Sequence, residues 1–429
     1  NIRTGLAKSH RGTFNLTRAD DLVAHCIDSL LDRNPGMSAD EVEDVVVGSA
    51  RQIGEQSANM ARHAAVLSKL PVSVSAMTLS RACSSGLNAI SVAANQIASG
   101  CSEIAIAGGV ESITGLERGT PAEFDNNPVL EADKPEIFMA MGNTAEVVAR
   151  RYKVSREAQD EYSLQSQQRY AAAVDDGRVQ DEITPMSVKW LKMLDKETKE
   201  TAIVEGTVDR DECNRPGTTL EGLAKLKPAF EQDGSVTAGN ASQLSDGASM
   251  TLLMSETRAE QLGFEPLAYF RGFTVAGCEP DEMGIGPVFA IPKLLKYKGL
   301  SLDDIDLVEL NEAFASQCLY CRDELGINND IYNVNGGSIS IGHPFGMTGS
   351  RMAGTVIREL RRRNKKLGLV SMCIGKGMGA AGCRANAHAR WQATVADISA
   401  ATESMSTEAR NQKLREARDV LNTELRNCG

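Results

Sequence analysis

The chain has 429 residues, of which 42% are hydrophobic, and this length fits two or three packed units with a large buried core. Its 46 basic and 57 acidic side chains give a formal net charge of −11, and only 4% of residues are aromatic, so we expect no nucleic-acid partner. The sequence contains no apolar run of the roughly 20 residues that a membrane-spanning helix needs. Ten scattered cysteines indicate reduced thiols rather than a secreted disulfide framework.

The amino end is polar and begins with Asn1 instead of methionine. We therefore expect a fragment that lacks the first strand of its fold, together with any targeting segment that preceded it. Because the sequence has no membrane-spanning run and its polar amino end is not a signal peptide, we expect an intracellular chain: cytoplasmic in a bacterium, otherwise mitochondrial or peroxisomal.

Short β-branched runs alternate with helical patterns along the chain, which predicts an α/β fold with a largely parallel sheet covered by helices. We expect the strands at residues 45–47, 72–79, 103–107, 307–310, 331–334 and 368–372, and helices at 87–98 and 352–362.

The pattern occurs twice. An acidic residue opens an apolar strand at Asp44 and again at Asp306. The first strand precedes a strand-turn-helix unit centred on Cys83, and the second precedes a similar unit centred on His343 at nearly the same separation. We interpret this as a duplicated α/β half. Because sites in parallel sheets gather at strand ends, we expect Cys83, His343 and Cys373 to meet.

These patterns predict four regions. Residues 1–112 form the first half without its first strand, 113–238 an inserted loop domain, 239–383 the second half and 384–429 an appended tail. The insert contains a predicted helix over residues 155–174 that Ser155 caps. After Gly382, Arg384 and the tail replace the short closing strand that the fold would have, so we expect this strand to be missing. The pattern of residues 409–425 predicts a charged helix.

Cys83 precedes a helix rich in small residues, so we expect it near a helix N-terminus, where the partial positive charge favours a thiolate. The alternative is an inert buried cysteine. His343 lies in a turn dense in glycine and is the candidate base, with a structural turn histidine as the alternative. Asn311 follows a strand and could either cap a helix or position a water at an oxyanion.

Cys373 ends an apolar strand and is followed by glycines that would give a ligand close access to the backbone. Residues 377–382 match G-x-G-x-x-G, but no second βαβ unit follows, so we do not expect dinucleotide binding. Cys318 and Cys321 form a single C-x-x-C without a second pair, so we expect neither a metal site nor a redox motif.

Four motifs in this order resemble the thiolase family: residues 83–86 (CSSG), 311–314 (NEAF), 342–344 (GHP) and 373–375 (CIG). The resemblance extends from about residue 3 to 382. It implies two related βαβαβαββ halves in an α-β-α-β-α arrangement of layers, with an inserted loop domain. It also implies a homodimer or homotetramer.

The activity that the resemblance implies is the reversible cleavage of 3-oxoacyl-CoA by coenzyme A, with ping-pong kinetics through an acyl-cysteine. Cys83 matches the nucleophile, His343 the residue that activates it and Cys373 the acid/base. Asn311, through a water, and His343 match one oxyanion site, and the N–H groups of Cys83 and Gly375 match the other.

The partners implied are acyl-CoA and CoA, with CoA as a substrate and no permanently bound cofactor or metal. Arg215 and Ser242 match positions that contact CoA, and Lys225 and Lys227 are further candidates to hold this polyanion. At the position of Ala140, the short-chain biosynthetic members of the family have a histidine. The alanine in this chain therefore favours a degradative activity on longer acyl chains.

The alternatives are a biosynthetic acetyl-CoA C-acetyltransferase, a condensing enzyme on the same duplicated fold, a Cys-His hydrolase and a non-catalytic acyl-CoA or lipid-binding protein. The presence of Cys373 beside the other motifs argues against the condensing enzyme and the hydrolase. The intact set of Cys83, His343 and Cys373 argues against a binding protein.

Overall fold

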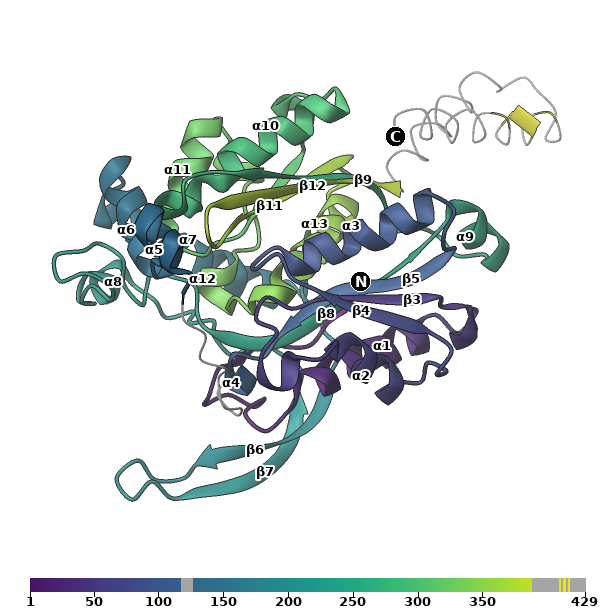
Figure 1. Cartoon of the computed structure of the whole chain (residues 1–429), viewed down its shortest axis with the longest axis horizontal. Helices are drawn as coiled ribbons and strands as arrows, with labels where there is room; N and C mark the ends of the chain where they lie inside the picture. Colours follow the sequence, from purple (N-terminus) through teal and green to yellow (C-terminus); the bar gives the residue numbers. More distant parts are fainter. Residues whose placement is uncertain (117–125, 388–408, 410–411, 414–415, 417–429) are drawn as a thin grey trace.

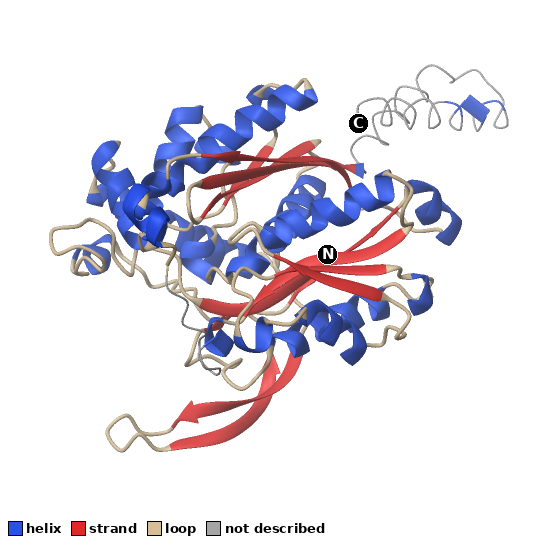
Figure 2. Ribbon diagram, viewed as in Figure 1, coloured by secondary structure: helices blue, strands red, loops and turns tan. Residues whose placement is uncertain are grey.

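The computed structural model describes residues 1–116, 126–387, 409, 412–413 and 416. Helices and sheets alternate in five layers, α-β-α-β-α, as Figures 1 and 2 show. This confirms the predicted fold class. The charged helix expected over residues 409–425 falls almost wholly outside the described residues.

The first sheet has the strand order β1-β8-β5-β3-β4, and β2 pairs with β8. β3 runs parallel to β4 and β5, whereas β8 runs antiparallel to β1 and β5. The strands are β1 (Ile2–Arg3), β2 (Ala7–Lys8), β3 (Asp44–Gly48), β4 (Ser75–Leu79), β5 (Ile104–Glu111) and β8 (Ser245–Met254).

The second sheet has the order β10-β11-β12-β9, with one parallel pair, β10 and β11, and two antiparallel pairs. The prediction of a largely parallel sheet is therefore wrong, because antiparallel pairs outnumber parallel pairs in both sheets. In the second sheet, β12 returns from β11 through a tight hairpin. The strands are β9 (Ala268–Gly277), β10 (Leu307–Leu310), β11 (Leu367–Ile374) and β12 (Met378–Asn386).

The middle layer consists of one helix from each half, α3 (Ser85–Ala98) and α13 (Phe345–Arg362), which lie between the two sheets (Figure 1). Their apolar faces form one cluster with both sheets, including Leu87 and Ile90 from α3 and Met352 and Val356 from α13. Full burial of such a side chain contributes about 1.5–3 kcal/mol. This shared core fixes the two halves against each other.

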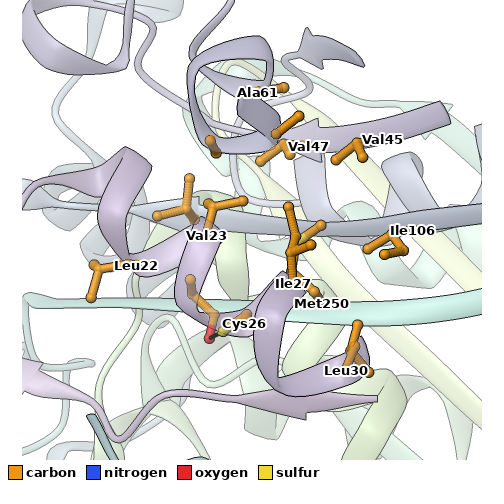
Figure 3. Packing of buried hydrophobic residues seen from close by; sticks show 14 of the residues in the cluster. Leu22, Val23, Cys26, Ile27, Leu30, Val45, Val47, Ala61, Ile106 and Met250 are labelled. Atoms are coloured by element: carbon orange, nitrogen blue, oxygen red, sulfur yellow. Dashed lines mark hydrogen bonds between the residues drawn. The ribbon is translucent and has the colours of Figure 1, made fainter. Parts of the chain in front are cut away.

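Each outer layer covers one sheet. α1 (Ala19–Arg33) and α2 (Met60–Leu67) pack on the first sheet, and α10 (Gly286–Lys298) and α11 (Ala315–Leu325) lie over the second. Figure 3 shows the first of these cores, where α1 residues such as Ile27 meet Val45 of β3, Ile106 of β5 and Met250 of β8.

The segment between β5 and β8 packs on both halves. α6 and α7 lie against α11, and β6 and β7 form a hairpin whose Val188 and Val208 join the core of the first half (Figure 1). α7 begins after Ser155, whose hydroxyl accepts from the Ala158 N–H as predicted. The elements are α4 (Ile113–Leu116), α5 (Pro128–Asp133), α6 (Met141–Arg151), α7 (Arg156–Asp175), β6 (Met186–Met193), β7 (Thr201–Val208) and α8 (Leu220–Ala224).

The structure also shows how the repeat is built locally. A 3-10 turn precedes β3, and its Ser38 and Glu41 form a capping box; Ser301 and Asp304 form the same box before β10. Each box satisfies N–H groups of its turn and fixes the direction in which the chain enters the strand. Two shorter α-helices are α9 (Glu256–Leu262) and α12 (Ser338–Ile341).

Three details differ from expectation. The strand after residue 239 is β8, which belongs to the first sheet, so the sheet of the second half starts only at Ala268. Residues 331–334 form no strand, because Asn333 adopts a left-handed φ of 45° and its side chain bonds Leu310 N and O. The closing strand is present: β12 continues through Arg384, whose guanidinium lies over the Phe270 ring.

The two residues of β1 pair with β8 at the edge of the first sheet. The absence of the first strand of this half stays a prediction. No helix within the described residues combines the length and apolarity required to cross a membrane.

Candidate active site

The two middle helices meet at their N-terminal ends, and this contact brings the two motif loops together. Gly86 follows Cys83 by three residues, and Gly346 follows His343 by three. A Cβ atom on Gly86 would lie only 2.5 Å from the Gly346 carbonyl oxygen, so the two backbones are in direct contact. The loops that carry Cys83 and His343 therefore come from opposite halves and adjoin at this contact.

Cys83 lies on a tight turn between β4 and α3. The Ser85 hydroxyl accepts from the Arg81 N–H at 2.9 Å and donates to the Ala82 carbonyl at 2.6 Å, which closes the turn. The turn requires Ala82 to adopt a left-handed φ of 44°, a conformation that costs a residue with a Cβ about 1–2 kcal/mol. The turn leaves Cys83 half-buried just before the helix.

The Cys83 sulfur is a protonated thiol at rest. Desolvation by burial and the nearby Glu111 carboxyl together raise its pKa to about 11. The N–H groups of Gly375 and of Cys83 itself face the sulfur and lower the pKa. Because its pKa is raised, the thiol needs a base before it can attack.

His343 is 2% exposed, and both of its ring nitrogens have partners. Nε2 lies 3.2 Å from Nδ2 of Asn311, and Nδ1 lies 2.7 Å from the hydroxyl of Thr348. Burial lowers the pKa of His343 to about 3, and the positive charge of Arg351 lowers it too. The imidazole is therefore neutral at pH 7 and can accept a proton.

Cys373 ends β11 and is fully buried in a cluster with Phe314, Ala313 and Met283. Desolvation raises the pKa of its thiol well above the ordinary value, and the neighbouring Cys83 raises it further. The chain then turns at Gly375, whose N–H faces Cys83. Two thiols and one backbone donor therefore lie around a single point.

The two positions predicted to contact CoA lie near each other at the edge of this site. The Arg215 guanidinium donates to the Gln243 side chain at 3.4 Å, and the N–H of the preceding Ser242 donates to the Ala313 carbonyl at 2.9 Å. Ala313 is two residues from Asn311. The loop carrying Ser242 is thereby attached to the motif that carries the asparagine, and Arg215 is exposed beyond it.

Other sequence motifs do not join the site as ligands. Cys318 and Cys321 are both buried in α11, where their thiols lie 3.4 Å from Asn311 O and 3.5 Å from Gly284 O. The glycine run at residues 377–382 lies at the hairpin and along β12, not between a strand and a helix. Among the described residues, no three His, Cys, Asp or Glu side chains are grouped closely enough to hold a metal ion.

Sequence reasoning missed three polar residues behind the site. Glu111 accepts from the N–H groups of Ala50 and Gly346, and so joins the end of β5 to the start of α13. Ser338 donates to Asn311 at 2.6 Å, and Thr348 contacts His343. Only Glu111 carried a signal in the sequence, as an acidic residue at the end of an otherwise apolar strand.

Comparison with known proteins agrees with this geometry. Residues 1–257 match the model of the family described as "Thiolase, N-terminal domain", and residues 264–385 match "Thiolase, C-terminal domain". The chain is 46% identical over 381 residues to a 3-ketoacyl-CoA thiolase of Bacillus subtilis, a match that covers 89% of this chain and 96% of the relative.

Two solved structures have the same fold. The dimeric peroxisomal thiolase of Saccharomyces cerevisiae and an acetyl-CoA acetyltransferase of Bacillus anthracis both superpose with a TM-score of 0.80 at 37% identity. Each covers 90% of this chain, and the matches span 95% and 97% of the two structures, respectively. The chain belongs to the thiolase family, and it is an acyltransferase.

Proposed function

We propose that the protein catalyses the thiolytic cleavage of 3-oxoacyl-CoA by CoA, giving acetyl-CoA and an acyl-CoA two carbons shorter. The observation that carries this proposal is the proximity of the Cys83 sulfur to the Gly375 N–H and to Cys373. The buried Asn311–His343 pair supports it. The 46% identity to a 3-ketoacyl-CoA thiolase supports the substrate class.

In the first half-reaction, His343 takes the Cys83 proton and the thiolate attacks the 3-oxo carbon. The bond between C2 and C3 then breaks, C2 takes the proton of Cys373, and acetyl-CoA leaves. In the second half-reaction, the thiol of CoA gives its proton to the Cys373 thiolate and attacks the acyl-cysteine. Cys83 leaves as a thiolate and recovers its proton from His343, so all three groups return to their starting states.

The pKa values of the unliganded groups set one requirement on this scheme. A base with a pKa of about 3 cannot hold a proton taken from a thiol with a pKa of about 11 unless the charged products stabilise each other. A thiolate and an imidazolium in a buried site attract strongly, and this attraction offsets part of the difference. Each pKa therefore describes one group while its partner is neutral.

Two sets of donors would stabilise the negative oxygen atoms. The N–H groups of Gly375 and Cys83 face the sulfur, so they are placed to bind the oxygen of an acyl group attached to it. Asn311, through a water, and His343 would serve the oxygen of the acetyl thioester. Removing one such donor typically costs about 10²–10³ in kcat.

We assign the recognition of CoA to Arg215 and Ser242 at the edge of the site, with Lys225 and Lys227 as additional positive charges. A protein of net charge −11 needs such local positive groups to hold a polyanion. The scheme requires no permanently bound cofactor or metal, because cysteine and histidine supply the nucleophile, the base and the acid.

Two variants test the mechanism. Cleavage of acetoacetyl-CoA and of a longer 3-oxoacyl-CoA is followed with added CoA. We expect Cys83→Ala to form no acyl-enzyme, and Cys373→Ser to be acylated from acyl-CoA but to fail at carbon-carbon cleavage. Cys101→Ser, at an exposed loop, is the matched control and keeps full activity. Cleavage by Cys83→Ala and Cys373→Ser at the rate of the parent enzyme contradicts the proposal.

The same assay separates the degradative activity from that of a short-chain acetyltransferase. Ala140 caps α6, and the adjoining Met141 lies over Gly375, where its sulfur would be 3.3 Å from an added Cβ. We expect higher kcat/KM for the longer substrate. A preference for acetoacetyl-CoA supports the acetyltransferase assignment instead.

We extend the proposal to the assembly. One similar structure is of a dimeric thiolase, and β4 lies at the edge of the first sheet, where a second copy could pair with it. Light scattering coupled to gel filtration is expected to give the mass of a homodimer or homotetramer. A monomer mass at micromolar concentration contradicts this extension and leaves the activity assignment unaffected.

A further inference from the structure

A chain of buried side chains runs from Arg351 in α13, through Ser338 in α12 and His343, back to Thr348 in α13. The Arg351 guanidinium lies 3.4 Å from the Ser338 hydroxyl, which lies 2.6 Å from Oδ1 of Asn311. Asn311 Nδ2 is 3.2 Å from Nε2 of His343, and His343 Nδ1 is 2.7 Å from the Thr348 hydroxyl. None of these five residues is more than 3% exposed.

The hydrogen atoms in this chain can be assigned from its two ends. At one end, the Thr348 hydroxyl donates its only proton to the Pro344 carbonyl at 2.9 Å. A carbonyl oxygen can only accept, so the Thr348 oxygen is left to accept from His343. With the Thr348 proton on that carbonyl, Nδ1 of His343 is the donor to Thr348 and carries the proton of the neutral ring.

The other end leads to the same result. Arg351 donates to the Ser338 oxygen, and the Ser338 hydroxyl donates to Oδ1 of Asn311. This orients the Asn311 amide with its NH₂ group toward His343. Nε2 of His343 then has to accept, which requires its lone pair to be free of a proton.

We propose that Thr348 and Ser338 are positioning residues that hold His343 as the Nδ1–H tautomer, with its Nε2 lone pair directed into the site. This inference rests on the proposed function, in which Nε2 takes the proton of Cys83. In the other tautomer Nε2 carries a hydrogen and the ring cannot act as a base toward the thiol. In the resting site the Asn311 amide donates a hydrogen bond to the Nε2 lone pair. This hydrogen bond breaks when Nε2 takes the proton of the thiol.

The surroundings of the chain hold it in place. Arg351 is fixed by the buried Glu309, whose carboxylate lies 3.8 Å away. Glu312 accepts from the N–H of Ile339, the residue after Ser338, at 3.1 Å, and so fixes α12. The charged groups that act on this chain of side chains are thus Arg351, with its partner Glu309, and Glu312, which binds the N–H after Ser338.

Thr348→Val provides the decisive test, because valine keeps the branched shape and removes the acceptor. We expect kcat for thiolysis to fall at least about tenfold with KM changed less than about twofold; in a nucleophile–histidine pair, the wrong tautomer alone can cost as much as about 10⁴ in kcat. Thr348→Ser restores the hydroxyl and is expected to stay within about threefold of the parent. Thr355→Val, two turns further along the same helix and also buried, is the matched control.

A spectroscopic measurement reads the tautomer directly. The chain has only five histidines, so ¹⁵N-histidine labelling gives few signals, and the ring nitrogens of the two tautomers differ in chemical shift. In the parent protein we expect one histidine locked as Nδ1–H, and we expect that signal to be lost in His343→Asn. In Thr348→Val the same histidine is expected to shift toward the Nε2–H form.

Ser338→Ala tests the other end of the chain. It frees the Asn311 amide to rotate, so we expect a smaller loss of kcat, about three- to tenfold, with a partial shift of the tautomer. Ser340→Ala, in the same short helix and equally buried, is the control and should retain both activity and tautomer.

The outcomes separate this inference from the proposed function. If the parent enzyme cleaves 3-oxoacyl-CoA while Thr348→Val keeps both its kcat and the Nδ1–H signal, the inference is wrong and the function stands. If the parent cleaves no 3-oxoacyl-CoA but the Nδ1–H signal still depends on Thr348, the tautomer assignment stands and the function is wrong. A loss of kcat without a tautomer shift also overturns the inference, since it would mean that Thr348 acts only through packing.

Discussion

The loops before α3 and α13 occupy equivalent places in the two halves but present their central residues differently. Cys83 is half-buried on a turn with a left-handed residue, whereas His343 is almost fully buried and hydrogen-bonded at both nitrogens. A nucleophile has to be reached by a substrate, and a base has to be oriented and kept from water. The duplicated unit thus provides one accessible and one enclosed position at the same contact between helices.

The largest effect is expected from removing the enclosed group. We expect His343→Ala to lower kcat for thiolysis by about 10²–10⁴, because the Cys83 thiol is protonated and loses its base. Steady-state kinetics measure the change. His25→Ala, on the outer helix α1, is the control and should remain within about twofold of the parent. Activity of His343→Ala close to the parent value would show that Cys83 is activated in another way.

The contact between the two helix starts is the next target. In Gly346→Ala, the added Cβ would lie 2.3 Å from the Val110 carbonyl oxygen and 2.7 Å from that of Gly48, both of which belong to rigid backbone. We expect the free energy of unfolding to fall by about 3 kcal/mol or more. Urea denaturation measures it. Gly217→Ala, with no atom within 4 Å of the added Cβ, should leave stability unchanged.

The two loops are also expected to limit stability at opposite ends of the pH scale. The pKa of His343 is about 3 in the folded chain and near 6.5 when unfolded, so the unfolded state binds the extra proton as pH falls between these values. Its contribution to the free energy of unfolding should drop by about 2 kcal/mol between pH 6 and pH 4. Denaturation at both pH values checks this. In His343→Asn the free energy of unfolding should fall less between pH 6 and pH 4, with no change at alkaline pH.

At the alkaline end the sign reverses. The pKa of Cys83 is raised, so above the ordinary thiol pKa of 9.0 the unfolded chain loses a proton that the folded chain keeps. Stability should therefore fall as pH rises from about 9 toward 11. Cys83→Ser should weaken this limb without removing it, because burial also raises the pKa of Cys26 and Cys213. An unchanged alkaline limb would mean that Cys83 is more hydrated than its surroundings suggest.

The smallest effect concerns the turn itself. Ala82→Gly relieves the left-handed backbone, and we expect a gain of about 1 kcal/mol in the free energy of unfolding. The same substitution at Ala89, within α3, should cost about 1 kcal/mol, because glycine weakens a helix interior. Thermal denaturation of the two variants shows whether each one gains or loses stability. A loss of stability in Ala82→Gly would show that the turn is not strained.

Local patterns predicted those parts of the fold that depend on neighbours in the chain. Ser155 caps α7 because its hydroxyl reaches an N–H three residues on, and the acidic starts of β3 and β10 belong to the repeated unit. The order of the four motifs identified the family. The pairing of β8 with β5 could not be predicted, because an antiparallel neighbour is chosen by the shape of the whole sheet and not by the strand's own residues.

The sequence by itself determined the repeat, the α/β class and which thiols and imidazole to consider, since periodicity and motif order are properties of the chain. Only the tertiary structure decided the protonation of those groups and their supporting contacts. Thr348 and Ser338 are ordinary hydroxyl residues until α12 and α13 place them beside Asn311 and His343. The pKa of Cys83 is raised, despite the adjacent helix N-terminus, because the folded chain buries the thiol and brings Glu111 close to it. Neither cause is visible in residues 81–86.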